Sequence, residues 1–310
     1  MKTKTYLFAL MAMAFTLGSC SDNENGIGSE TSKYITVSTS ICNMTRVATD
    51  ANGGQTFEEG DEISVYAWTG DEISVYAWTG DATVAPETSE RVVNNAINKL
   101  TNGSWVSTPQ MLWKNNRDKH YFIGVYPTAA ISDLSAGEYT FDVTKQTESD
   151  LLAAVNADGL SYNADKQQTV PLTFTHVMAK LVVNLTYKNQ WGGIPTVEKV
   201  VVGNAAKEAT INYLTKVVTP STTAKEDFSL PEITENTKYV SVIIPQEEVK
   251  QLTIVIGGKN FVYDNGTPFK LESGKITTVN LEVGRDEIKL GDVKITDWED
   301  GSTFSGEAIN

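Results

Sequence analysis

Short runs of alternating apolar and polar residues recur along most of the chain, with the period of two that is typical of β-strands. In the first half, these runs cover residues 35–39, 63–68, 121–126 and 139–143. In the second half, they cover residues 180–187, 197–202, 239–244, 252–256, 260–263, 276–283 and 288–295. They are rich in β-branched and aromatic residues and are bounded by turn formers, so each run predicts a strand.

Helical periodicity is confined to residues 89–100 and 150–157, which predict short helical insertions of two or three turns. Gly257 and Gly258 predict a tight hairpin, and residues 264–266 predict the next reversal. The chain is therefore expected to be all-β. About a dozen strands are too many for one small sandwich. We predict two β-sandwich domains in series, divided at the polar stretch near residues 157–168: 33–166 and 167–310 with its tail.

A ten-residue segment is repeated in tandem. Residues 60–69, Gly-Asp-Glu-Ile-Ser-Val-Tyr-Ala-Trp-Thr, recur unchanged as residues 70–79. Because ten is an even number, a slide by one whole repeat keeps every side chain on its original face of a sheet. Either one copy forms the strand and the other is displaced as a loop or added hairpin, or two near-equivalent registers coexist. A displaced copy would have the features of an aggregation-prone edge.

The amino-terminal segment has the features of an export signal. Lys2 and Lys4 precede an apolar run over residues 6–17, which is too short to cross a bilayer. The run ends in Leu-Gly-Ser-Cys at residues 17–20, which resembles a bacterial lipobox. In lipoproteins of that kind the peptidase cuts before the cysteine, and Cys20 would carry the acyl chains that hold the mature protein to a membrane.

We therefore expect residues 1–19 to be a lipoprotein signal peptide and residues 20–32 to be a polar linker. The polar and partly acidic residues 21–25 resemble the signal by which Bacteroidetes lipoproteins reach the outer surface. The predicted location is the cell outer membrane, as a surface-exposed lipoprotein. The alternative is a cleaved signal of a soluble secreted protein, in which Cys20 stands by coincidence.

The charge of the chain limits its partners. Lys and Arg number 25 against 39 Asp and Glu, which gives a formal net charge of -14. Such a chain repels phosphate backbones, so we exclude a nucleic-acid partner. Cys42 is the only other cysteine, so an acylated Cys20 leaves no pair for an intramolecular disulfide.

Candidate catalytic and metal-binding residues form no recognisable motif. Of the two histidines, we expect His120 to be a solvated residue before a strand and His176 to have a structural role at a strand start. Two histidines and one cysteine make no zinc site of the usual ligand spacing. Two acidic clusters lack the spacing of a calcium loop and are interpreted as solvated faces: Asp61, Glu62, Asp71 and Glu72; Asp297, Glu299, Asp300 and Glu307. The sequence predicts no catalytic site, metal or cofactor.

Aromatic residues leave room for sugar binding. Tryptophan rings can stack on sugars, but alternating strand positions more often place such rings in cores or cross-strand pairs. The six tryptophans are Trp68, Trp78, Trp105, Trp113, Trp191 and Trp298. A surface-anchored glycan-binding lipoprotein is therefore the alternative function.

Several short motifs, in order along nearly the whole mature chain, resemble the fimbrillin-like (Mfa-like) family of Bacteroidetes. Those in the first half are Thr45-Arg46, residues 57–67, residues 121–127, and Gln146 with residues 150–154. Those in the second half are residues 171–181, the turn at residues 271–275 and Ile-Thr-Asp-Trp at residues 295–298. The exact tandem repeat departs from the family pattern.

The resemblance implies two tandem transthyretin-like β-sandwiches and a subunit of a type V pilus, a fimbrium used in cell adhesion. In such pili a surface protease that cuts after arginine removes the anchor together with the first strand. The groove then accepts a donor strand from a neighbouring subunit, by hydrogen bonding to unpaired backbone groups and by insertion of alternate side chains. Before cleavage, the protein's own strand fills the groove.

On this chain, the resemblance places the leaving strand at residues 34–41 and the candidate processing site between Arg46 and Val47. Residues 47–55 are rich in Gly, Ala and Asn, which suits access by a protease. The alternative is an exposed arginine that is never cut. The candidate donor strand covers residues 291–298 and the tail to residue 310, with apolar side chains at Val293, Ile295 and Phe304.

Three functions remain open: a structural pilus subunit, an anchored or tip adhesin of the same fold, and a surface glycan-binding lipoprotein. The expected partners are other pilus subunits, the outer membrane through the lipid anchor, and ligands on host or bacterial surfaces.

Overall fold

The computed structural model describes residues 33–41, 48–49, 55–56, 72–101, 104–146, 148–164, 166, 168–264 and 266–298. All of them belong to one compact unit, Thr31–Asn310. Several predicted features lie outside the described residues: the signal peptide, Cys20, Arg46, Val47, the first copy of the repeat and Phe304. Among the described residues, no helix has the length and apolar character needed to span a membrane.

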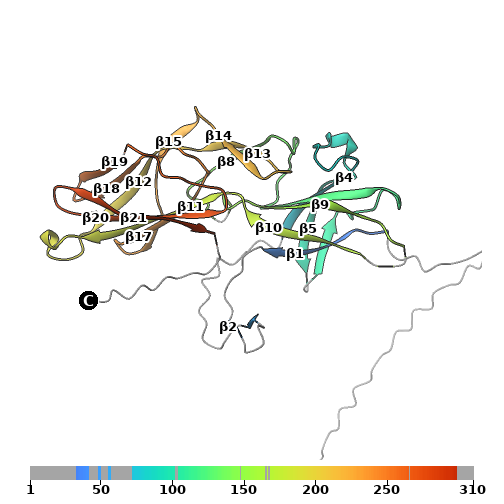
Figure 1. The fold of residues 1–310 in the computed structure, drawn as a ribbon, viewed down its shortest axis with the longest axis horizontal. Coiled ribbons are helices and arrows are strands. Elements are labelled where there is room, and N and C mark those ends of the chain that lie inside the picture. Colours follow the sequence, from blue (N-terminus) through green and yellow to red (C-terminus); the bar gives the residue numbers. More distant parts are fainter. Residues whose placement is uncertain are drawn as a thin grey trace, which may run out of the picture. The chain divides into compact units, whose positions relative to one another are not determined.

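The first sheet has seven strands in the order β1-β10-β9-β7-β4-β5-β6. In that order they are Thr36–Ile41, Thr169–His176, Leu152–Ser161, Lys119–Tyr126, Glu72–Thr79, Val93–Thr101 and Ser104–Thr108. Figure 1 labels β1, β4, β5, β9 and β10 among them. Only β1 and β10 pair in parallel within this sheet; its other neighbours are antiparallel. Buried side chains on one face of the sheet, among them Val75, Phe122 and Phe174, form a hydrophobic core of their own.

The second copy of the repeat forms β4, a central strand of this sheet. It pairs with β7 on one side and with β5 on the other. Its side chains from Ile73 to Trp78 are all buried, because core residues cover both faces of the strand. Residues 63–68, predicted as a strand in the first copy, lie outside the described residues.

Two further sheets face each other as the layers of a sandwich (Figure 1). The first has the order β16-β17-β11-β20-β21: Glu232–Thr234, Lys238–Ile243, Ala179–Tyr187, Lys275–Val283 and Ile288–Asp297. The second has the order β15-β12-β18-β19: Lys225–Ser229, Val197–Ala206, Gln251–Ile256 and Lys259–Asp264. Inward residues of both sheets, such as Leu181 and Ile254, share one core.

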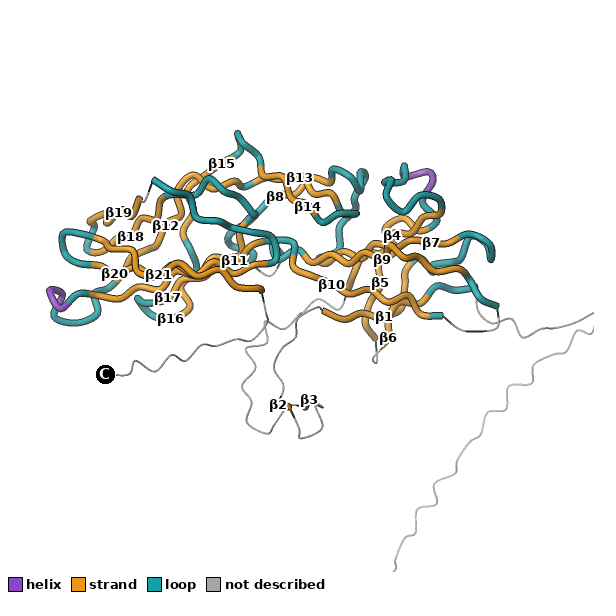
Figure 2. The backbone as a smooth tube through the Cα atoms, in the orientation of Figure 1, coloured by secondary structure: helices purple, strands orange, loops and turns teal. Residues whose placement is uncertain are grey.

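A small third layer joins segments that are far apart in sequence. Strand β8 (Gly137–Thr140) pairs with β13 (Glu208–Asn212), which pairs with β14 (Val217–Pro220). Strands β2 (Ala48–Thr49) and β3 (Gln55–Thr56) pair with each other. Helical structure among the described residues is limited to the single 3-10 turns η1 (Thr88–Glu90) and η2 (Asn189–Trp191) (Figure 2).

The all-β prediction is confirmed. The strands expected in the second half fall on observed strands, and Gly257 and Gly258, both with positive φ, form the predicted hairpin turn between β18 and β19. The two helical predictions are wrong: residues 89–100 lead into and form most of β5, and residues 150–157 form the start of β9. Both segments lie in the sheet, where neighbouring strands satisfy their backbone groups.

The division of the chain into domains at residue 166 stays a prediction. The next strand, β10, pairs with β1 and β9 of the first sheet, so it is part of that sheet. The chain passes from the first sheet to the sandwich at Val177 and Met178, which are fully buried between β10 and β11.

Candidate functional site

Strand β1 covers one end of the core of the first sheet. Its side chains alternate: Ile35, just before the strand, is 2% exposed and Val37 is 5% exposed, whereas Ser38 and Ser40 face solvent. This period of two is the pattern that predicted the strand, and it places one apolar row inward. The inward row belongs to the same core as β4, β7 and β10.

One side of β1 is held by a parallel ladder to β10. The register runs from Thr36 opposite Thr169 to Ile41 opposite Phe174. The Thr36 hydroxyl adds a hydrogen bond to the carbonyl oxygen of Gln168 at 3.2 Å. A backbone ladder needs only an extended segment, so another strand of suitable side-chain pattern could make the same bonds.

The other side of β1 meets the opposite end of the same sheet. The Ile35 N–H donates to the Met111 carbonyl at 2.9 Å, and the Trp113 N–H donates to the Lys33 carbonyl at 3.1 Å. The indole N–H of Trp105 on β6 donates to the Thr39 hydroxyl at 3.1 Å. Strand β1 therefore closes the sheet between its two ends, and its removal would expose backbone groups on both sides.

The side chains beneath β1 form the floor of this candidate site. They come from the segment after β6 and from β10, and all are buried: Met111, Trp113, Val170, Leu172 and Phe174. Sequence patterning did not identify Met111 and Trp113, because their segment makes only the isolated bridge of Tyr34 with Leu112 and has no alternating run.

His120 supports the floor from behind, which corrects the prediction of a solvated histidine. It is fully buried, with its ring 5.0 Å from that of Trp113 in an edge-to-face contact. Its Nε2 accepts the Lys114 N–H at 3.0 Å, and Nδ1 lies 3.1 Å from the Asp118 carbonyl. Burial lowers the pKa of His120 below its ordinary value of 6.5, because the charged form would lose its hydration.

The candidate donor strand, β21, lies at the edge of the five-stranded sheet and pairs only with β20. Val293 is 42% exposed and Ile295 is 39% exposed, so neither contributes much to the core. Trp298, directly after the strand, is 4% exposed and donates its N–H to the Gly274 carbonyl at 3.0 Å. The structure thus places β1 and β21 in different sheets.

His176 has the structural position expected of it, but at the end of β10 and not at a strand start. Its ring stacks on that of Trp298 at 3.9 Å, and its Nδ1 lies 2.8 Å from a carboxylate oxygen of Asp150. These contacts hold the end of the candidate donor strand beside the first sheet.

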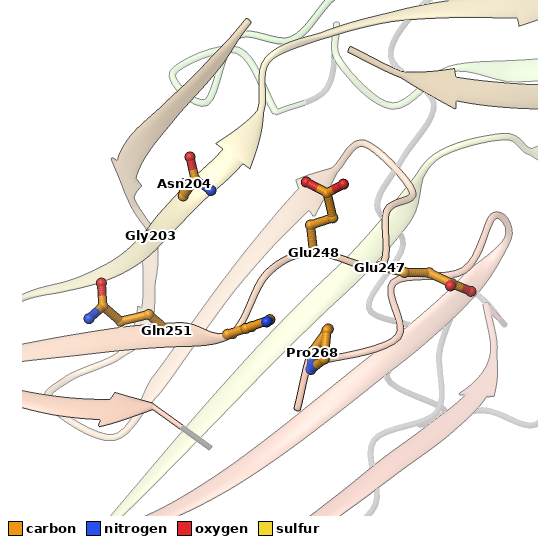
Figure 3. A pocket seen from close by; sticks show the side chains of 7 residues that line it. Gly203, Asn204, Glu247, Glu248, Gln251 and Pro268 are labelled. Carbon is orange, nitrogen blue, oxygen red and sulfur yellow. The ribbon is translucent and has the colours of Figure 1, made fainter. Parts of the chain in front are cut away.

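Surface cavities lie on the sandwich. One of about 530 Å³ lies beside β12 and β18, with Asn204, Glu248 and Gln251 on its walls (Figure 3). Within the described part of the chain, no three His, Cys, Asp or Glu side chains are placed to hold a metal ion. The Asp297 carboxylate pairs with Lys275. The other residues of the two acidic clusters lie outside the described residues, or their side chains do.

The described tryptophans are inside the protein or partly covered. Trp78, Trp113 and Trp298 are buried, and Trp105 and Trp191 are half-buried. Both half-buried indoles donate hydrogen bonds within the protein, Trp191 to the Val283 carbonyl at 2.9 Å. Stacking on a sugar requires an open ring face, which the three buried rings do not offer.

Comparison with solved structures shows the same fold in proteins of Bacteroides. A candidate cell adhesion protein from Bacteroides uniformis superposes with a TM-score of 0.57 at 20% identity, covering 74% of this chain and 92% of that one. A second, from Bacteroides ovatus, has a TM-score of 0.59 at 17% identity, covering 86% of this chain and 97% of that one. No curated protein sequence matches.

The family comparison covers most of the chain. Residues 45–298 match the family described as fimbrillin-like, a span that runs from just before the candidate processing site to the tryptophan after β21. By that match, the chain belongs to the fimbrillin-like family.

Proposed function

We propose that this protein is a subunit of a surface pilus that assembles by strand exchange. In this proposal the segment that ends at Arg46, with β1, is removed, and an extended segment of a neighbouring subunit takes its place. The observation that carries the proposal is the position of β1: it closes the first sheet at both ends and covers an apolar floor. Family membership and fold are consistent with this role.

Energetics favour replacement of the strand over an open groove. Full burial of Ile35 and Val37 contributes about 1.5–3 kcal/mol for each side chain. Loss of β1 would also leave backbone groups of β10 and of the segment near Met111 without these partners. A donor strand with apolar residues at alternate positions would restore both contributions.

The donor is proposed to come from the carboxyl-terminal end, residues 291–298 with the tail to residue 310. Val293, Ile295 and Phe304 would be the inserted side chains. In support, β21 is an edge strand with most of its surface exposed, so its release disturbs little of the sandwich core. Release requires extraction of Trp298, which is the main buried group at that end.

Export and anchoring complete the proposal. The precursor would travel as a lipoprotein acylated at Cys20, be held at the outer membrane and be released from this anchor by cleavage between Arg46 and Val47. Its partners would be other subunits of the fimbrium. The two Bacteroides proteins of the same fold are described as candidates for cell adhesion, and we assign adhesion to this chain on that basis.

Treatment of the mature chain with an arginine-specific protease tests the proposal. The matched control is Arg46→Lys, which keeps the charge but removes the arginine. We expect the wild type to acquire the amino terminus Val47, lose β1 and form polymers in size-exclusion chromatography and electron microscopy, while the variant stays monomeric. A cleaved wild-type chain that stays monomeric and retains the severed segment would refute strand exchange.

A further inference from the structure

We call the place of β4 between β5 and β7 the β4 slot. The side chains that make the contacts in this slot occur twice in the chain. The Ser74 hydroxyl accepts the Ala129 N–H at 3.0 Å, and the Tyr76 hydroxyl accepts the Ile131 N–H at 2.9 Å. The Trp78 side chain, 2% exposed, fills the adjoining core. Each of these side chains has an identical counterpart ten residues earlier in the sequence.

The duplication extends into the turn that follows the strand. The Trp78 indole donates to the Asp81 carbonyl at 3.0 Å, and Gly80 has a φ of +113°, which L side chains rarely adopt. The same Gly-Asp pair follows the first copy at residues 70 and 71. The first copy therefore carries the same side chains for the slot and the same Gly-Asp pair at its exit. The Thr83 hydroxyl also donates to the Asp81 carboxylate at 2.7 Å, and this bond has no counterpart, because Ile73 occupies the matching position.

The connection after β4 is anchored to residues outside β4 as well as to the strand, where the Val92 N–H donates to the Ala77 carbonyl at 2.8 Å. The Arg91 guanidinium donates to the Ile131 carbonyl at 2.7 Å and to the Ser132 carbonyl at 2.6 Å. The Thr88 hydroxyl donates to the same Ser132 carbonyl at 3.4 Å. Ten further residues could therefore be inserted between the strand and this anchor without displacing it.

Chain connectivity does not strongly favour either copy. With the second copy in the slot, the connections on the two sides are residues 42–71 and 80–92. With the first copy in the slot, they would be residues 42–61 and 70–92. The probability of closing a loop falls roughly as the 3/2 power of its length. The combined closure probability of the two connections therefore differs between the two arrangements by a factor of only about 1.3.

We infer that residues 60–69 are a second, equivalent β4, and that the folded protein exists in two threadings that differ in which copy fills the central slot. The inference rests on the identity of the copies, the even repeat length and the shared exit turn. A substitution that disrupts one copy would leave the threading that uses the other copy intact.

Paired substitutions test the inference on the mature chain. The variants are Trp68→Ala, Trp78→Ala and the double variant, with Phe122→Ala in β7 as the control, because Phe122 is fully buried and occurs once. We expect each single variant to lower the ratio of folded to unfolded protein about twofold, the effect of losing one of two equal states. The double variant and the control should lower the ratio by a factor of about a hundred or more.

Fluorine NMR with 5-fluorotryptophan supplies a readout that does not depend on stability. The resonance of the indole in the β4 slot should persist in both single variants, since the other tryptophan takes that place, and should vanish in the double variant. One threading alone is established, and the inference overturned, if Trp78→Ala removes this resonance or destabilises the protein as much as the double variant. A stable double variant would also overturn it.

Discussion

At the scale of single residues, His120 makes stability depend on pH. Its pKa is lowered in the folded state by burial, so below about pH 6.5 the unfolded chain binds a proton that the folded chain resists. Stability is therefore highest above pH 6.5 and falls as the pH drops toward the folded pKa, by at most about 1.4 kcal/mol per pH unit from this group. Urea unfolding of the wild type and His120→Gln at pH 7 and pH 5 measures this contribution.

Other groups near His120 titrate or carry charge, so the difference between the two proteins is the relevant quantity. Lys114 and Asp118 act on the imidazole in opposite directions, and both remain in the variant. We expect the wild type to lose more stability than His120→Gln between pH 7 and pH 5. Equal losses in the two proteins would show that His120 accepts its proton in the folded state as readily as in the unfolded state.

The same charge should destabilise the protein strongly at one residue of β1 and hardly at all at the next. Val37→Asp places a carboxylate in the apolar core beneath the strand, and we expect a loss of about 3 kcal/mol or more in the free energy of unfolding. Ser38→Asp places it on the exposed face, with an expected change within about 0.5 kcal/mol. Chemical denaturation of both variants checks the difference. Similar losses of unfolding free energy in the two variants would mean that β1 does not have the register described here for its pairing with β10.

At the scale of elements, the two wrong helix predictions have separate physical causes. In β5, the buried residues Val93 and Ala96 are three apart, which is a helical spacing. A bulge produces this spacing: Asn95 has a φ of +56°, and the register to β4 shifts between Val75 and Ala77. An extra residue in a strand thus imitates a helix in the sequence pattern.

The start of β9 was misassigned for a different reason. Residues 151–154 form a continuous apolar run, which periodicity alone cannot assign to a buried helix or to a strand covered on both faces. In the structure, this strand lies between β7 and β10 with both faces buried at its start. The deciding information is its pairing partners, which are distant in sequence.

The sequence predicted β1 and part of the floor beneath it, but not the segment on the other side of β1. The alternation at residues 35–39 gives the inward positions of β1, and the run at residues 171–181 includes part of the floor. The contacts of β1 with Met111 and Trp113 depend on closure of the sheet between its ends, which leaves no local periodicity. Local patterns therefore identified the strand itself, but not the segment near Met111 and Trp113 against which it packs.

Strand β21 should be held mainly by the residue that follows it. Trp298→Ala removes the ring that stacks on His176 and contacts the Lys180 ammonium at 5.2 Å. We expect a loss of about 3 kcal/mol or more, with faster amide exchange over residues 288–297 and unchanged protection in β11. Val293→Ala is the matched control, because its exposed side chain should matter little. Unchanged exchange in Trp298→Ala would place the stabilising contacts within the strand itself.

At the scale of the whole molecule, the first sheet and the sandwich are joined by specific polar contacts as well as by a common core. The Gln146 side chain donates to the Ser241 hydroxyl at 3.0 Å and accepts the Val242 N–H at 2.7 Å. Gln146 was among the residues that carried the family resemblance, and this bridge to β17 gives it a structural reason. The pairing of β8 with β13 adds a backbone link between the two parts.

The charge of the molecule opposes the assembly that we propose. Residues 1–46 contain four cationic and three anionic side chains, so removal of this segment leaves the large negative charge in place. Subunits of like charge repel, and salt shortens the range of this repulsion from about 30 Å at 0.01 M to about 8 Å at 0.15 M. The association rate of the cleaved protein should therefore rise about tenfold or more over that range, as measured by light scattering. A rate that falls with added salt would instead reveal attraction between oppositely charged surfaces at the contact.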